Sequence, residues 1–222
     1  MPLGDLSSRM TSYELPVSFS IIAHFTFGVT GALSGLRRGY DIIGVFFMAV
    51  VTAIGGGLIR DGLLISSGPA SILTNGMLLG VVLGAALLAL VFQSAFDRLG
   101  RAIAIIDALG LGAFTVYGVQ RSLSAGLSDP AAIMGGMITA VGGGLLRDVL
   151  SREEPLLLKP GQFYALVALV GCTLYMGLPR LGWMTPPEAA NVTIVVVFVL
   201  RMLAIRYNWT TRALRREPPP PP

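Results

Sequence analysis

The chain alternates long apolar stretches with short polar separators. Seven of the stretches approach the roughly 20 residues that a helix needs to cross a hydrocarbon core. They are Val17–Leu36, Ile42–Ile65, Ile72–Phe92, Ala102–Val119, Ala131–Leu150, Phe163–Leu178 and Ala189–Ile205. The separators are rich in turn-forming residues, and none is long enough to hold a soluble domain. The pattern predicts an all-α integral membrane protein with seven transmembrane helices.

An internal repeat divides these spans into two sets of three. The segment Val51–Asp61 recurs as Ile138–Asp148 with an offset of 87 residues, and each copy lies in the middle span of its set. Because three crossings is an odd number, the second set must begin on the opposite side of the membrane. The predicted plan is therefore two inverted three-helix repeats plus one extra helix, as in many transport proteins.

This plan predicts five segments along the chain. Residues 1–16 form an N-terminal segment that lacks the features of a secretory signal, so the first apolar stretch should remain in the mature protein. Residues 17–93 form the first repeat, 101–178 the second, inverted repeat, and 189–206 the seventh helix. Residues 207–222 form a basic, proline-rich tail whose composition predicts disorder.

Composition and charge support a membrane location. The chain is 54% hydrophobic and 13% charged, with a mean hydropathy of +0.74. Its net charge is +4, but the basic residues lie between apolar segments or at the C-terminus, which suits anionic lipid headgroups and argues against a nucleic-acid partner. Eleven basic residues fall on the side of the C-terminus and four on the other, with Arg201 inside the last span. The bias predicts a cytoplasmic C-terminus and an external N-terminus.

The repeated motif carries three consecutive glycines in the middle of a span. Each weakens a helix by roughly 1 kcal/mol relative to Ala, which predicts a kink or local unwinding. Freed backbone groups are tolerated in lipid only where protein or a water-filled cavity receives them, so two such breaks would line a polar gap near the midplane. The alternative is that the glycines only permit close helix crossing. The candidate pore residues are Gly55, Gly56, Gly57, Gly142, Gly143, Gly144, Thr52 and Thr139.

A charged pair follows each glycine run by three to four residues. The four residues are Arg60, Asp61, Arg147 and Asp148. An unpaired charge inside a membrane costs several kcal/mol, so they should be paired or solvated. Two interpretations stay open: the pairs line opposite mouths of one pathway or contact lipid there, or they anchor span ends at the headgroups by snorkelling.

Three further polar residues lie inside apolar spans. Asp107 is a functional candidate as an intramembrane acid, or faces interfacial water near the start of its span. His24 is interpreted as a packing histidine, with a proton-linked gate as the alternative. Arg201 is expected to be a snorkelling or lipid-facing anchor. The single cysteine, Cys172, is expected to be a small buried packing residue.

Other chemistry is absent from the sequence. No metal-ligand spacing, phosphate-binding loop or nucleophile elbow occurs, so we predict no catalytic residues, no metal site and no resident cofactor. The Thr-Val-Gly-Tyr-Gly filter of tetrameric potassium channels is also missing. The chain is not expected to be an enzyme.

The duplicated Gly-Gly-Gly-x-x-Arg-Asp motif, the seven spans and the segment from Asp107 to Gly112 resemble bacterial and archaeal members of the trimeric intracellular cation (TRIC) channel family. These sequences are also grouped under a glycine transporter domain name and as UPF0126. The resemblance runs from about Val17 to Ile205. It implies a homotrimer with one pore per protomer, kinked second and fifth spans, potassium as the permeant ion, bound lipid, and a bacterial or archaeal inner (plasma) membrane.

One departure limits what the resemblance implies. Animal members carry a Lys-Glu-Val signature tied to phosphoinositide lipid, and this sequence lacks it. Regulation of the animal kind is therefore not carried over. The functional hypothesis is a potassium-permeable channel, the alternative is a secondary transporter of a small amino acid such as glycine, and a third class is a non-conducting scaffold.

Overall fold

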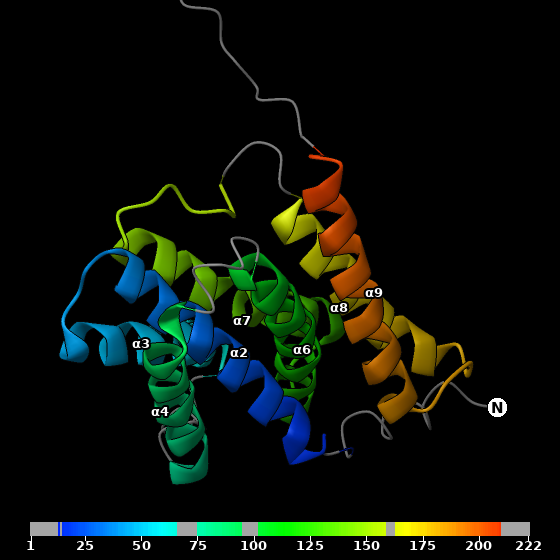
Figure 1. Ribbon diagram of the computed structural model, residues 1–222. Coiled ribbons are helices and arrows are strands. Elements are labelled where there is room, and N and C mark those ends of the chain that lie inside the picture. Colours follow the sequence, from blue (N-terminus) through cyan, green and yellow to red (C-terminus); the bar gives the residue numbers. More distant parts are fainter. Residues whose placement is uncertain (1–12, 14, 66–74, 95–101, 159–162, 210–222) are drawn as a thin grey trace, which may run out of the picture.

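A computed structural model describes residues 13, 15–65, 75–94, 102–158 and 163–209, and Figure 1 shows them as a bundle of helices. The helices are α2 (Val17–Arg37), α3 (Ile42–Leu64), α4 (Gly76–Val91), α6 (Ala102–Ser124), α7 (Asp129–Leu150), α8 (Tyr164–Arg180) and α9 (Pro186–Arg206). Five are long and apolar enough to cross a membrane, and α4 and α8 are shorter apolar helices. Each predicted span corresponds to one helix, which confirms the all-α fold class.

The helix ends differ from the prediction at several points. Helix α6 continues to Ser124, five residues beyond the predicted span. A turn was predicted from Pro179 onward, but α8 runs through Pro179 to Arg180. Pro179 costs α8 one hydrogen bond, to the Tyr175 carbonyl, but the helix continues to Arg180 and the chain turns at Gly182, where φ is +72°. Predicted segments 1–16 and 207–222 lie mostly outside the described residues.

The two halves of the bundle repeat the same set of helix contacts. Helix α2 packs on α3 and α4 as α6 packs on α7 and α8, and α3 touches α4 as α7 touches α8. Between the halves, α2 meets α6 and α3 meets α7. Helix α9 has no counterpart: it packs on α6 and α8, on the side of the bundle opposite α4 (Figure 1).

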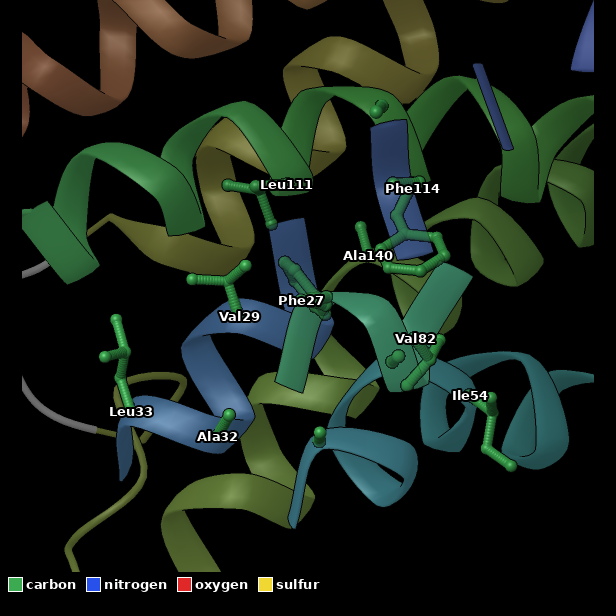
Figure 2. Packing of buried hydrophobic residues seen from close by; sticks show 14 of the residues in the cluster. Phe27, Val29, Ala32, Leu33, Ile54, Val82, Leu111, Phe114 and Ala140 are labelled. Carbon is green, nitrogen blue, oxygen red and sulfur yellow. The ribbon is translucent and has the colours of Figure 1, made fainter. Parts of the chain in front are cut away.

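The core lies between the two repeats. Phe27 of α2 and Phe114 of α6 pack edge to face, with ring centroids 4.8 Å apart, and Figure 2 shows them at the centre of the cluster. These two residues are 87 positions apart, so each is the other's counterpart in the repeat. The outward faces are apolar as well: Ile43 and Leu63 of α3 are 75% and 71% exposed. Such a surface suits a lipid environment.

Candidate functional site

The glycine runs lie where α3 and α7 cross. A Cβ atom at Gly56 would lie 2.2 Å from the carbonyl oxygen of Thr139, and one at Gly143 would lie 2.1 Å from the carbonyl oxygen of Thr52. No side chain fits at these distances, so the crossing requires glycine at both positions. Along α3 the contacts run forward from Thr52 to Gly56, whereas along α7 they run backward from Gly143 to Thr139. The two helices therefore run antiparallel, as inverted repeats require.

The first glycine of each run also contacts the opposite helix. A Cβ at Gly55 would lie 2.4 Å from the Leu146 side chain, and one at Gly142 would lie 2.9 Å from the Cα of Gly56. The first and second glycines of each run thus form the helix crossing.

The third glycine of each run faces polar groups instead. The nearest atom to a Cβ at Gly57 is Nη2 of Arg60, at 3.9 Å. A Cβ at Gly144 would lie 3.2 Å from the Tyr164 hydroxyl and 3.7 Å from Nη2 of Arg147. Gly57 and Gly144 are therefore the members of the runs that adjoin the buried guanidinium groups.

Of the predicted kink or local unwinding, the unwinding is wrong, because helical backbone continues through both glycine runs, and the kink stays a prediction. The physical reason is the close crossing: the backbone of the partner helix packs against the glycines and supplies the contacts that their side chains lack. The role of these residues as pore lining stays a prediction.

Arg60 of α3 is buried in the bundle, and we call this residue with its partners Asp61, Thr139 and Tyr117 the Arg60 half. Its side chain is 1% exposed. Nε donates to Oδ1 of Asp61 at 2.8 Å, and Nη1 donates to Oγ1 of Thr139 at 3.2 Å. The guanidinium also lies 5.7 Å from the centroid of the Tyr117 ring, within cation–π range. Arg60 thus connects α3 to both α6 and α7.

Arg147 of α7 binds two carboxylates, and we call this residue with Asp107 and Asp148 the Arg147 half. Nε donates to Oδ1 of Asp148 at 3.0 Å, and Nη1 donates to Oδ1 of Asp107 at 2.8 Å. The second oxygen of Asp148 accepts the backbone N–H of Leu156 at 3.0 Å. Asp107, Arg147 and Asp148 thus form a buried ion-pair cluster between α6 and α7.

A cavity of about 290 Å³ opens in the Arg147 half. Its lining comprises Arg37, Ile103, Ala104, Asp107, Arg147, Leu156, Arg201, Ala204, Ile205 and Asn208. A second cavity of about 140 Å³ shares Arg37, Ile103, Arg147 and Leu156 with it. Neither cavity is lined by Arg60 or Asp61. Arg147 thus borders both of these cavities.

The charged groups predicted to face lipid headgroups or interfacial water are buried. Arg60, Asp107, Arg147 and Arg201 are between 1% and 4% exposed, so the snorkelling interpretation is wrong for the three arginines. Arg201 lies over the Tyr164 ring, 4.8 Å from its centroid, and lines the larger cavity. The cost of a charge in lipid is avoided because carboxylates and aromatic faces inside the bundle receive these groups.

His24 packs among aromatic rings. Its ring centroid lies 5.1 Å from that of Phe114 and 5.8 Å from that of Tyr117, both edge to face. Nδ1 lies 2.7 Å from the carbonyl oxygen of Ser20, so it carries the proton and donates. These contacts fit the packing interpretation. Cys172 is a free, buried thiol, as expected.

Two tyrosines and three polar contacts of the site were not predicted from the sequence. The Tyr117 ring lies under the Arg60 guanidinium, and the Tyr164 ring lies under that of Arg201. A tyrosine in an apolar span could have indicated such a contact, because its hydroxyl needs a polar partner. The three contacts link the repeats at the Arg147 end: Ser34 to Ser151 at 2.7 Å, Arg38 to Glu153 at 2.8 Å, and the Tyr40 hydroxyl to the Leu150 carbonyl at 3.0 Å. The two residues of each contact are far apart in sequence, so no local pattern predicts the contact.

Fold and site together define a class of multi-pass helical membrane protein: two inverted three-helix repeats joined at a glycine crossing. A family model described as "Glycine transporter" matches residues 17–94 and 104–180. The UPF0126 membrane protein of Deinococcus radiodurans is 32% identical over 94% of this chain and 97% of its own length, and the inner membrane protein YadS of Escherichia coli is 32% identical over 85% and 90%. The chain belongs to the TRIC/UPF0126 family.

Solved structures agree with this assignment. A TRIC channel structure determined to explain cation conductance is similar with a TM-score of 0.78 and 32% identity, covering 92% of this chain and all of that one. The TRIC orthologue from Rhodobacter sphaeroides gives a TM-score of 0.80 and 30% identity, covering 86% and 97%. At these identities the likeness extends beyond the fold to the sequence itself.

Proposed function

We propose that this protein is a monovalent cation channel that passes potassium along the crossing of α3 and α7. One observation carries the proposal: the inverted crossing has a buried Arg-Asp pair on each side of it, and both members of one pair line a cavity. The solved relatives that share this fold are TRIC cation channels. Gly57 and Gly144, which adjoin the guanidinium groups, are the proposed pore-lining members of the glycine runs.

Charge balance makes cation passage physically reasonable beside two arginines. Arg60 is paired with Asp61, and Arg147 is paired with Asp107 and Asp148, so the carboxylates offset the positive charge. Conduction needs sites that attract an ion weakly enough to release it. Carbonyl and hydroxyl oxygens near the crossing, next to neutralised charges, supply weak sites of this kind.

The assembly proposed is a homotrimer with a pore in each protomer. Helix α9 covers α8, where a Cβ at Gly171 would lie 2.4 Å from Val197. The counterpart on α4 is open: Gly80 and Gly84 have no atom within 4 Å of a built Cβ. Small residues on an uncovered membrane helix favour close packing of another helix, so α4 is the proposed subunit contact. The apolar surface outside the α4 contact faces membrane lipids in this assembly.

The orientation proposed places the Arg147 half at the cytoplasm and the N-terminus outside, in a bacterial or archaeal inner membrane. Arg38, just after α2, pairs with Glu153, Ser34 of α2 bonds Ser151, and Arg37 lines a cavity together with Arg147. Basic residues are thus gathered at one end of the bundle, and that end should be cytoplasmic.

A second candidate function is transport of a small amino acid such as glycine. The cavity in the Arg147 half presents a carboxylate and guanidinium groups together, which complements a zwitterion. The family description points the same way.

Purified protein in a planar bilayer under a potassium gradient separates the two functions. A channel gives currents that reverse at the potassium equilibrium potential. Gly62→Ala serves as a matched control that keeps this current, because Gly62 has no atom within 4 Å of a built Cβ. Saturable, gradient-coupled glycine uptake without such current would contradict the channel and support the transporter.

A further inference from the structure

The two arginines make the same bonds with two of their three side-chain nitrogens and differ in the third. In both, Nε and Nη2 hold Oδ1 of the following aspartate, at 2.8 and 2.6 Å for Arg60 and at 3.0 and 3.0 Å for Arg147. Nη1 of Arg60 binds Thr139 across the helix crossing, whereas Nη1 of Arg147 binds Asp107. The pseudo-symmetry is therefore broken at a single atom.

Thr52 is the counterpart of Thr139 and lacks the arginine that symmetry would give it. Its side chain is fully buried, and its hydroxyl has no hydrogen-bond partner among the described residues. Thr139, in contrast, accepts from Arg60 and donates to the carbonyl of Gly135 at 2.6 Å. A buried hydroxyl without a partner is costly, so a donor that reached Thr52 would be stabilised there.

The residue that diverts Arg147 is Asp107. Its counterpart at the 87-residue offset is Ser20, whose hydroxyl lies 3.3 Å from Nδ1 of His24. A neutral serine competes poorly for a guanidinium, whereas a carboxylate forms a charge-assisted bond about twice as strong as a neutral one. Asp107 therefore outcompetes Thr52 for Nη1 of Arg147, and Ser20 leaves Arg60 on Thr139.

We propose that Asp107 is a positioning residue that holds Arg147 off Thr52 and so keeps the Arg147 half of the pathway open. In the Arg60 half, a guanidinium spans the crossing from α3 to Thr139. In the Arg147 half, the guanidinium is turned aside toward α6, and a cavity reaches it. This inference rests on the proposed channel function and adds which residue holds Arg147 away from the helix crossing.

Replacing Asp107 with the residue of its counterpart tests the proposal. In Asp107→Ser, Arg147 loses its acceptor on α6 and should move to Thr52, reproducing the Arg60 arrangement. Unitary conductance should fall about twofold, because a second barrier like the one at Arg60 is then added in series. Adding Thr52→Val removes the acceptor on α3, so the double variant should recover most of the current. Loss of structure would not be rescued in this way.

Two measurements decide the matter independently. A structure of Asp107→Ser, with Asp107→Asn as a second variant should the first not fold, should place Nη1 of Arg147 within hydrogen-bond distance of Thr52. Arg147 remaining away from Thr52 in the variant, or a double variant as poorly conducting as the single one, would overturn the proposal. Wild-type protein without potassium current would instead remove the channel function, while the position of Arg147 in the variant structure would still decide the role of Asp107.

Discussion

The Arg60 half and the Arg147 half come from one duplicated motif and have diverged in their surroundings. Arg60 meets one carboxylate, a threonine and an aromatic face, and its side chain is buried. Arg147 meets two carboxylates beside a cavity and lies in the half that α9 covers. The glycine crossing is common to both halves because it needs only backbone contact. One of the differences is a side chain on the preceding helix, Asp107 against Ser20, so duplicated scaffolds can keep their packing while single residues alter the polar interior.

The largest effect is expected at the shared crossing. Gly56→Ala or Gly143→Ala drives a Cβ into a backbone carbonyl at 2.2 or 2.1 Å, and backbone cannot yield as a side chain can. We expect a loss of about 3 kcal/mol or more, or failure to yield folded protein. Thermal unfolding in detergent measures this. Gly62→Ala is the control and should stabilise slightly, because Ala favours helix. Equal melting temperatures for Gly56→Ala and Gly62→Ala would rule out the tight crossing.

The next effect separates the two arginines. Arg147→Met leaves two buried carboxylates without their cation, whereas Arg60→Met leaves one. Removing one partner of a buried ion pair typically costs about 3 to 5 kcal/mol, and we expect Arg147→Met to lie at the upper end and Arg60→Met below it. Unfolding of both variants under identical conditions gives the order. A more destabilised Arg60→Met would show that the carboxylate count does not govern the difference.

A smaller effect is expected at the third glycine of each run. Gly144→Ala brings a Cβ within 3.2 Å of the Tyr164 hydroxyl, so the phenol must shift toward the cavity side, whereas Gly57→Ala meets nothing closer than 3.9 Å. Stability should change by about 1 kcal/mol or less in both, since Ala gains in helix propensity. Single-channel recording should show reduced conductance for Gly144→Ala and a near wild-type value for Gly57→Ala. The reverse order would show that the space around the added Cβ does not govern the effect on conductance.

The smallest effect concerns the links at the Arg147 end. The side chains of Arg38 and Glu153 are 36% and 54% exposed, so their ion pair is weakened by solvent. A double-mutant cycle with Arg38→Ala and Glu153→Ala should give a coupling of about 0.5 kcal/mol that disappears in high salt. A large, salt-insensitive coupling would mean that this link is a main connection between the repeats.

Much of the fold could be predicted from local pattern. Seven apolar stretches predicted seven helices, because a span needs a minimum apolar length. The offset of 87 residues predicted inverted halves, and Phe27 against Phe114 and Gly56 against Thr139 confirm the correspondence. Helix ends were less accurate near Pro179, since a proline in a final helical turn leaves the local signal of a turn without ending the helix.

The candidate site was predicted in its residues but not in its arrangement. The sequence placed Arg60, Arg147 and Asp107 inside spans, yet the snorkelling interpretation depends on whether a partner exists inside the bundle. That partner is supplied by another helix: Asp107 for Arg147, and Tyr164 for Arg201. The predicted unwinding at the glycines failed for the same reason, because a glycine run is weak only when no neighbouring backbone packs against it.

The sequence by itself determined that the chain crosses a membrane repeatedly, that its halves are inverted copies, and which polar residues lie within the spans, because these follow from length, hydropathy and repetition. Only the tertiary structure decided that the glycines make a tight antiparallel crossing and that Arg60 and Arg147 bind different partners. Both depend on distances of a few ångströms between helices far apart in sequence. Thr139 can accept from Arg60, and Asp107 from Arg147, only once these helices are packed together.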